Sequence, residues 1–188
     1  MRTLWLPCLA LAALCSNSAM AINTYKDWKG EHVLFFGCPG VSTVYGQVIT
    51  VPKGKTHLNR FSFCFENYIG GDGMVVRGEV YKWDGEKASG AAVYESAPRK
   101  INFYDGAHEE RFSPLTIVSP GQYVLFASVD NDFKKCQEAG YDWGSLNDEY
   151  PGGAFVHQEN EGDYTRWTTV PWGVEDSVDL AFNASLRP

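Results

Sequence analysis

The stretch GQVITVPKGKTHLNRFSFCFEN, residues 46–67, decides the fold of this chain. Two runs of alternating residues flank the turn-forming sequence at residues 52–54, which is the pattern of two strands joined by a tight connection. In the second run Phe61, Phe63 and Phe65 fall on one side of the strand, and polar side chains fall on the other. We therefore expect the three phenylalanines to form the inner wall between two sheets, and not a binding face.

The same alternation recurs along the chain between clusters of Gly, Pro and Asp, and helical periodicity is nearly absent. The expected strands are residues 32–37, 44–51, 58–66, 74–83, 91–96, 112–117, 122–129, 153–158, 165–169 and 178–186. Short strands separated by Gly-rich or Pro-rich turns are typical of antiparallel sandwiches. We predict an all-β fold, a jelly-roll-like antiparallel β-sandwich of about ten strands.

The start of the chain resembles an export signal. An apolar run at residues 4–14 follows a basic start, and Ala19-Met20-Ala21 is a small-x-small cleavage pattern. The run is shorter than the roughly 20 residues of a transmembrane helix; a buried N-terminal helix is the alternative. We expect residues 1–21 to be a cleaved signal peptide and residues 22–188 to be a single β-sandwich domain, secreted or periplasmic, without membrane insertion after cleavage.

Charge narrows the range of partners. The chain has 23 Asp and Glu against 16 Lys and Arg, a formal net charge of −7. This excess repels phosphate backbones and anionic membrane surfaces, so we expect no nucleic-acid partner. Acidic loops instead suit divalent cations or neutral sugars.

One acidic loop is a candidate metal site. Asp130 and Asp132 follow the expected strand at residues 122–129, and hard oxygen ligands gathered in a loop are what Ca²⁺ requires. We expect a structural calcium ion there, with an ordinary solvated turn as the alternative. Zinc is disfavoured because the histidines are scattered, and AHEERF at residues 107–112 lacks the second His of the metalloprotease helix.

Three cysteines remain after the expected cleavage: Cys38, Cys64 and Cys136. An exported chain meets an oxidising compartment, so we predict one disulfide between two of the three and one remaining thiol. The spacing leaves the pairing open.

Support for catalysis is weak. No Ser or Cys stands in a recognised nucleophile motif, and no phosphate-binding loop is present. Glu66 and Glu79 could meet across a sheet as the two carboxylates of a glycoside hydrolase, but we favour the alternative, a solvent-facing sheet on which Arg60 or Arg77 is their partner. We lean towards a protein that is not an enzyme.

Five segments occur in order within residues 44–186: VYGQVITVPKGKTHLNRFSF, GEVYKWDGEKASGAAVYES, LTIVSPGQYVLFAS, YPGGAFVH and DLAFNASL. Together they resemble an uncharacterised family of exported bacterial β-sandwich domains with the pattern VYGQ-x-x-TVP, WDG, PGQ-Y-V-x-F, GGAFV and DLAF. The resemblance implies the fold and export, and it brings no activity and no catalytic residues. Members often carry a C-terminal sorting tail, which we do not expect here because the chain ends directly after its last strand.

Aromatic residues among short polar ones mark the candidate ligand-binding residues. Residues 130–151, expected to be a long connecting loop, contain Tyr141, Trp143 and Tyr150, and Trp83 precedes a turn elsewhere. Aromatic faces beside hydrogen-bonding groups suit sugar rings. The alternative is that these side chains cover the end of the core.

We therefore predict an exported, non-catalytic module that binds extracellular or cell-surface carbohydrate. A cell-surface or periplasmic structural module that recognises a surface protein is the second hypothesis, and a glycoside-active enzyme is the third.

Overall fold

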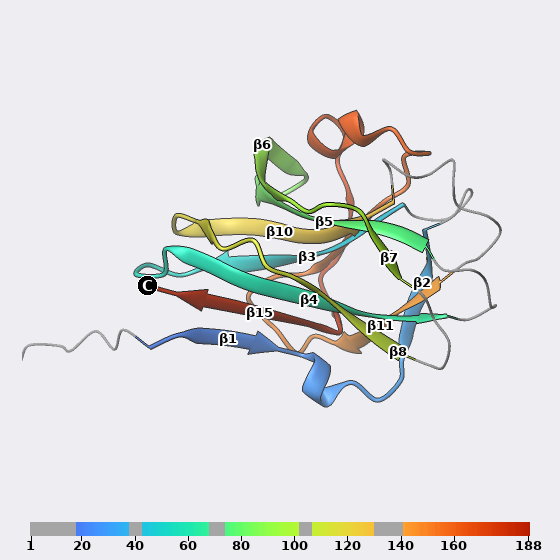
Figure 1. Cartoon of the computed structure of the whole chain (residues 1–188), viewed down its shortest axis with the longest axis horizontal. Helices are drawn as coiled ribbons and strands as arrows, with labels where there is room; N and C mark the ends of the chain where they lie inside the picture. Colours follow the sequence, from blue (N-terminus) through green and yellow to red (C-terminus); the bar gives the residue numbers. More distant parts are fainter. Residues whose placement is uncertain (1–17, 38–42, 68–73, 102–106, 130–140) are drawn as a thin grey trace, which may run out of the picture.

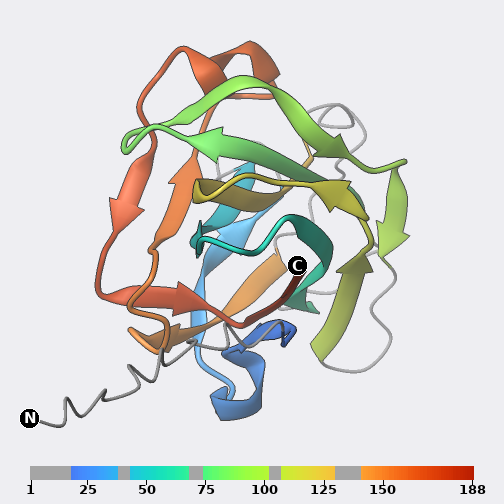
Figure 2. The same cartoon turned by 90° about the vertical axis from the view of Figure 1, so that its left-hand side faces the viewer.

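The computed structural model describes residues 18–37, 43–67, 74–101, 107–129 and 141–188. These residues form two antiparallel sheets that pack face to face, so the predicted all-β sandwich is confirmed (Figure 1, Figure 2). Two short 3₁₀ helices are also present in the described part, η1 (Tyr25–Asp27) and η3 (Tyr164–Thr168). No helix among the described residues has the length and apolar character that crossing a membrane requires.

One sheet has eight strands. These are β1 (Met20–Asn23), β2 (His32–Phe36), β4 (His57–Asn67), β8 (Ala107–Phe112), β9 (Thr116–Ile117), β11 (Tyr141–Asn147), β14 (Val178–Leu180) and β15 (Phe182–Arg187). The main path runs β1-β15-β4-β11-β14, with β2 beside β11, and with β8 and β9 beside β4.

The other sheet has seven strands. These are β3 (Val44–Val51), β5 (Met74–Trp83), β6 (Ala88–Glu95), β7 (Arg99–Ile101), β10 (Gly121–Ser128), β12 (Phe155–Gln158) and β13 (Gly173–Glu175). The order is β13-β12-β3-β10-β5-β6, and β7 pairs with β5. Strands β3 and β5 have the bounds that the alternation predicts.

The main core lies between the sheets. Phe61, Phe63 and Phe65 of β4 are all 0% exposed there, so the predicted inner wall is confirmed. Burial of each ring contributes roughly 1.5–3 kcal/mol relative to leaving it exposed. The alternation on β4 therefore specifies packing between the sheets.

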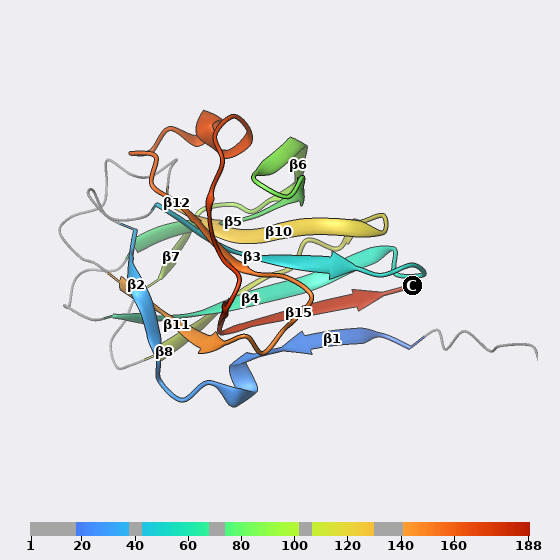
Figure 3. The same ribbon diagram turned by 180° about the vertical axis from the view of Figure 1, so that it is seen from behind.

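A second apolar cluster covers the outer face of the seven-stranded sheet. It comprises Val44, Val48, Ala88, Val124, Phe126, Val156, Trp167 and Trp172, with Tyr81 and Trp83 packed against it. Trp167 is the buried residue of η3, and η3 lies on the side of this sheet away from β4 and β15 (Figure 3). The second apolar cluster and η3 thus cover part of the outer face of this sheet, and the candidate site lies at the edge of the covered part.

Two strand predictions are wrong for local reasons. Residues 165–169 belong mostly to η3, because the Asp163 carboxylate accepts hydrogen bonds from the Thr165 N–H at 3.1 Å and hydroxyl at 2.6 Å and caps the helix. Residues 112–117 are not one strand, because Leu115 has a φ of 47° and separates β8 from β9.

Two further predictions fail because of tertiary pairing. The expected loop at residues 130–151 contains β11, which pairs with β2, β4 and β14. The expected strand at residues 178–186 breaks at Ala181, and Asp179 is 1% exposed.

At the N-terminal end, Met20 and Ala21 pair with Leu186 and Ser185 in β1 and β15. The predicted cleavage point therefore falls within β1. Processing there would leave Ile22 and Asn23 as the remaining residues of that strand.

Candidate functional site

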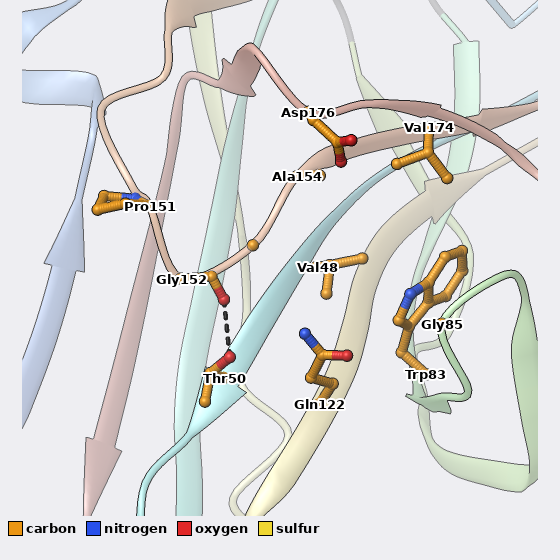
Figure 4. A pocket seen from close by; sticks show the side chains of 11 residues that line it. Val48, Thr50, Trp83, Gly85, Gln122, Pro151, Gly152, Ala154, Val174 and Asp176 are labelled. Atoms are coloured by element: carbon orange, nitrogen blue, oxygen red, sulfur yellow. Dashed lines mark hydrogen bonds between the residues drawn. The ribbon is translucent and has the colours of Figure 1, made fainter.

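A concavity of about 350 Å³ opens on the outer face of the seven-stranded sheet, beside the second apolar cluster (Figure 4). Its volume is at the lower end of the roughly 300–1,000 Å³ of small-ligand sites. The lining residues are Val48, Thr50, Trp83, Gly85, Gln122, Pro151, Gly152, Gly153, Ala154, Val174 and Asp176.

The register of the strands determines which residues form the floor of the concavity. Gln122 of β10 lies directly opposite Thr50 of β3, and Tyr123 lies opposite Lys82 of β5. Extending the second register by one residue puts Trp83 beside Gln122. Thr50, Gln122 and Trp83 thus form a row across three neighbouring strands, on one face of the sheet.

The second apolar cluster holds Trp83 in place. The Trp172 ring packs edge-on against the Trp83 ring, with centroids 5.7 Å apart and an interplanar angle of 80°. Trp172 is itself fixed, because its indole N–H donates to the Trp167 carbonyl and its backbone N–H to the Glu86 carbonyl, each at 2.9 Å. This contact covers part of the Trp83 ring, and the indole also borders the concavity (Figure 4).

The turn after Trp83 is held by its own side chain. The Asp84 carboxylate accepts hydrogen bonds from the backbone N–H groups of Glu86 at 3.0 Å and Lys87 at 2.9 Å. These bonds lower the pKa of Asp84 below its usual value. The turn that carries Gly85 to the rim of the concavity is thus locally specified.

The opposite wall is the connection from β11 to β12, residues 148–154, which we call the wall loop. A Cβ on Gly153 would lie 1.7 Å from the Val48 carbonyl oxygen, so the loop reaches this position because residue 153 is glycine. The Val48 N–H donates to the Ala154 carbonyl at 2.9 Å, and the Thr50 hydroxyl donates to the Gly152 carbonyl at 2.7 Å. The wall loop therefore lies flat against β3.

Three side chains give the concavity its chemistry. The Trp83 indole offers an N–H donor and an apolar ring, the Gln122 amide offers a donor and an acceptor, and the Asp176 carboxylate accepts. Figure 4 shows all three around the same open space. Asp176 is the one charged side chain among the described residues that line it.

The sequence-predicted residues fall in different places. Trp83 lines the concavity. Tyr150 belongs to the wall loop and is half-buried, with its ring 5.9 Å from that of Phe182 and its hydroxyl accepting the Thr50 N–H at 3.1 Å. Tyr141 and Trp143 lie on β11 in the eight-stranded sheet, and their side chains are outside the described part, so their role stays a prediction.

Most of the predicted metal and disulfide residues lie outside the described part of the chain. These are Asp130, Asp132, Cys38 and Cys136, and the calcium site and the disulfide stay predictions. The residues that the structure does describe contain no group of three or more His, Cys, Asp or Glu that could hold a metal ion. Cys64 is described, and it is a free, buried thiol.

Glu66 and Glu79 do not form the carboxylate pair considered for a glycoside hydrolase, and Glu79 does not face solvent as the favoured alternative expected. Glu66 is on β4 in the eight-stranded sheet, and Glu79 is on β5 in the seven-stranded sheet, where it is 0% exposed. The two side chains therefore cannot flank one substrate as neighbours on a sheet.

Sequence reasoning missed Gln122 and Asp176. Gln122 belongs to the PGQ-Y-V-x-F segment, which the resemblance links to fold and not to a ligand, and Asp176 lies in a short polar turn after β13 and stands in no motif. The signal that finds Gln122 is register, because pairing β10 with both β3 and β5 puts it between Thr50 and Trp83.

No protein-family model matches the chain, and no curated protein matches it in sequence. Among solved structures, the chain is similar to the crystal structure of the cysteine protease and lectin-like domains of Cwp84, a surface-layer-associated protein of Clostridium difficile. The TM-score is 0.49 and the identity 8%, over 77% of this chain and 32% of that one. The chain thus spans about a third of the length of that structure, and a match at this level assigns it neither activity nor ligand.

Proposed function

We propose that this protein is an exported, non-catalytic module that binds neutral carbohydrate in the concavity beside Trp83. The observation that carries the proposal is the grouping of an indole, an amide and a carboxylate around one open space on a rigid sheet face. A surface-exposed or extracellular setting follows from the predicted signal peptide, and it is part of the proposal.

The three side chains match what a sugar ring presents. Its apolar C–H surface packs on an aromatic ring, while its hydroxyls donate to a carboxylate and exchange hydrogen bonds with an amide. In the described part of the chain, no side-chain contact ties up the Gln122 amide or the Asp176 carboxylate. Both groups are thus available to a ligand.

The negative charge in the lining of the concavity favours a neutral glycan. The lining includes the Asp176 carboxylate and no cationic side chain among the described residues. A uronic or sulfated polysaccharide would meet repulsion there, whereas a neutral one would not. The modest volume favours a short segment of a glycan chain as the bound unit.

The test is retention of the secreted protein on immobilised neutral polysaccharides, with an anionic polysaccharide as comparison, in calcium and in chelator. W83A should lose retention, with at least about a tenfold weaker affinity, because truncating a central aromatic anchor commonly costs more than about 1.4 kcal/mol. W28A is the matched control, since Trp28 caps η1, on the opposite side of the sandwich from η3 (Figure 1).

The outcomes separate the hypotheses. Retention that W83A abolishes and W28A keeps supports the site, and loss in chelator adds the predicted calcium. Retention that survives W83A and disappears in W143A would move the site to β11. Absence of retention on every glycan would overturn the carbohydrate proposal and leave a surface protein as the partner.

A further inference from the structure

A buried polar pair bridges the two sheets behind the concavity. Gln47 of β3 is 0% exposed and Asp179 of β14 is 1% exposed, and the Gln47 amide donates to the Asp179 carboxylate at 2.6 Å. The other end of Gln47 accepts the Leu180 N–H at 2.9 Å. The orientation of the Gln47 amide is therefore fixed by a partner on each side.

The second oxygen of Asp179 reaches the wall loop. It accepts the Tyr150 N–H at 2.5 Å, and the Glu149 N–H also donates to this carboxylate. The wall loop passes from β11 in one sheet to β12 in the other, so Asp179 fixes the point where the chain crosses. From there the loop continues through Gly152 and Gly153 along the concavity.

Burying this carboxylate is costly. Burial raises the pKa of Asp179, the hydrogen bonds from Tyr150 and Gln47 oppose that rise, and the charge of Asp148 adds to it. An apolar pair of similar shape would bridge the sheets without this cost. What an apolar pair could not do is accept two adjacent backbone N–H groups of the loop.

We propose that Asp179 and Gln47 are positioning residues of the binding site, which hold the wall loop in the place where it faces Trp83. The part of the claim that concerns affinity rests on the carbohydrate function proposed above. The part that concerns the loop can be tested without any ligand.

The test uses D179N and the double variant Q47E/D179N in the full protein. In D179N the new amide must turn its NH₂ either towards the Gln47 amide or towards the loop N–H groups, so a donor meets a donor. In the double variant the carboxylate and the amide exchange places. The carboxylate at position 47 accepts from the Leu180 N–H and from the new amide at position 179, and the oxygen of that amide accepts from the loop. Net charge and side-chain size stay the same.

Hydrogen exchange of the peptide spanning residues 148–154 gives the ligand-independent readout. We expect D179N to speed its exchange by about tenfold or more, since hydrogen bonds to a charged group are lost, and the double variant to restore it. Peptides from β4 and β10 should keep wild-type exchange. Affinity for the glycan that the wild type retains should fall by a similar factor in D179N and recover in the double variant.

Each other outcome overturns a defined part of the proposal. Unchanged loop exchange in D179N, or acceleration of every peptide alike, would show that the pair does not position the loop. A loosened loop with unchanged glycan affinity would separate the loop from the site. If the wild type retains no glycan, the carbohydrate function fails, and the exchange data still decide whether Asp179 positions the loop.

Discussion

Replacing Gly153 by alanine is the sharpest test of how the wall loop is built. The added Cβ would lie 1.7 Å from the carbonyl oxygen and 2.6 Å from the carbonyl carbon of Val48. Both atoms belong to the backbone of a central strand, so neither can rotate away. The separation must grow to at least 3.0 Å, which requires the wall loop to retreat from β3.

The expected loss of stability follows from the hydrogen bond that breaks when the wall loop moves away from β3. The Val48 N–H donates to the Ala154 carbonyl at 2.9 Å, and these residues are 2% and 7% exposed. Leaving a buried backbone group unsatisfied costs about 1–3 kcal/mol, and overpacking costs about 1–3 kcal/mol more. We expect G153A to destabilise the protein by about 3 kcal/mol, which lowers Tm by about 6–12 °C for a chain of this size.

The neighbouring G152A is the matched control. Its Cβ would meet the far end of the Tyr150 ring at 2.6 Å, and a ring can tilt at the expense of the hydrogen bond to the Thr50 N–H. We expect about 1 kcal/mol, the value of one such bond. Thermal unfolding followed by circular dichroism compares the two variants. Equal Tm values, or a smaller loss for G153A, would refute the argument from backbone contact.

Three further predictions concern parts of the sandwich away from the concavity. F63A should cost about 3–5 kcal/mol in denaturant unfolding, because Phe63 is 0% exposed, and a loss below about 1 kcal/mol would contradict its place in the core. The Cys64 thiol, whose pKa burial raises to about 12, should react with a thiol reagent only after unfolding; rapid native labelling would show that it is accessible. Burial raises the pKa of Glu109, but hydrogen bonds from Arg111 and Ser62 outweigh burial, so the pKa in the folded protein is lowered. The charged Glu109 therefore stabilises the fold above its unfolded pKa, and this stabilisation should be lost as pH falls below about 4.5. The E109Q variant should show a weaker dependence of Tm on pH in this range.

The sandwich could be predicted because most strands carry the alternation themselves. Residues 74–83 alternate over most of their length and the phenylalanines of β4 bury on one face, so burial decides which way these two strands turn. Residues 44–51 are nearly all buried, because both faces of β3 are covered. Strand β11 could not be predicted in this way. Its sequence YDWGSLN is polar and contains glycine, and it is a strand because neighbours on both sides supply its hydrogen bonds.

The candidate site could be predicted only in part. Trp83 is recognisable from its place before a turn, and it lines the concavity. Gln122, Asp176 and the Gln47–Asp179 pair join segments that are far apart in the chain, and their meeting depends on register and on the break at Ala181. A local sequence pattern predicts neither the strand register nor the break at Ala181.

The pairing of β1 with β15 also bears on when the chain can fold. Residues 20–23 find their partners at residues 183–186, and the Thr24 hydroxyl donates to the Leu180 carbonyl at 2.6 Å. Strand β15 is in turn the neighbour of β4 in the middle of the sheet, so the core phenylalanines lack one side until residues 178–187 have been made. Contacts this distant in sequence form slowly. Synthesis therefore has to reach residues 182–187 before β1 and β4 can pair with β15.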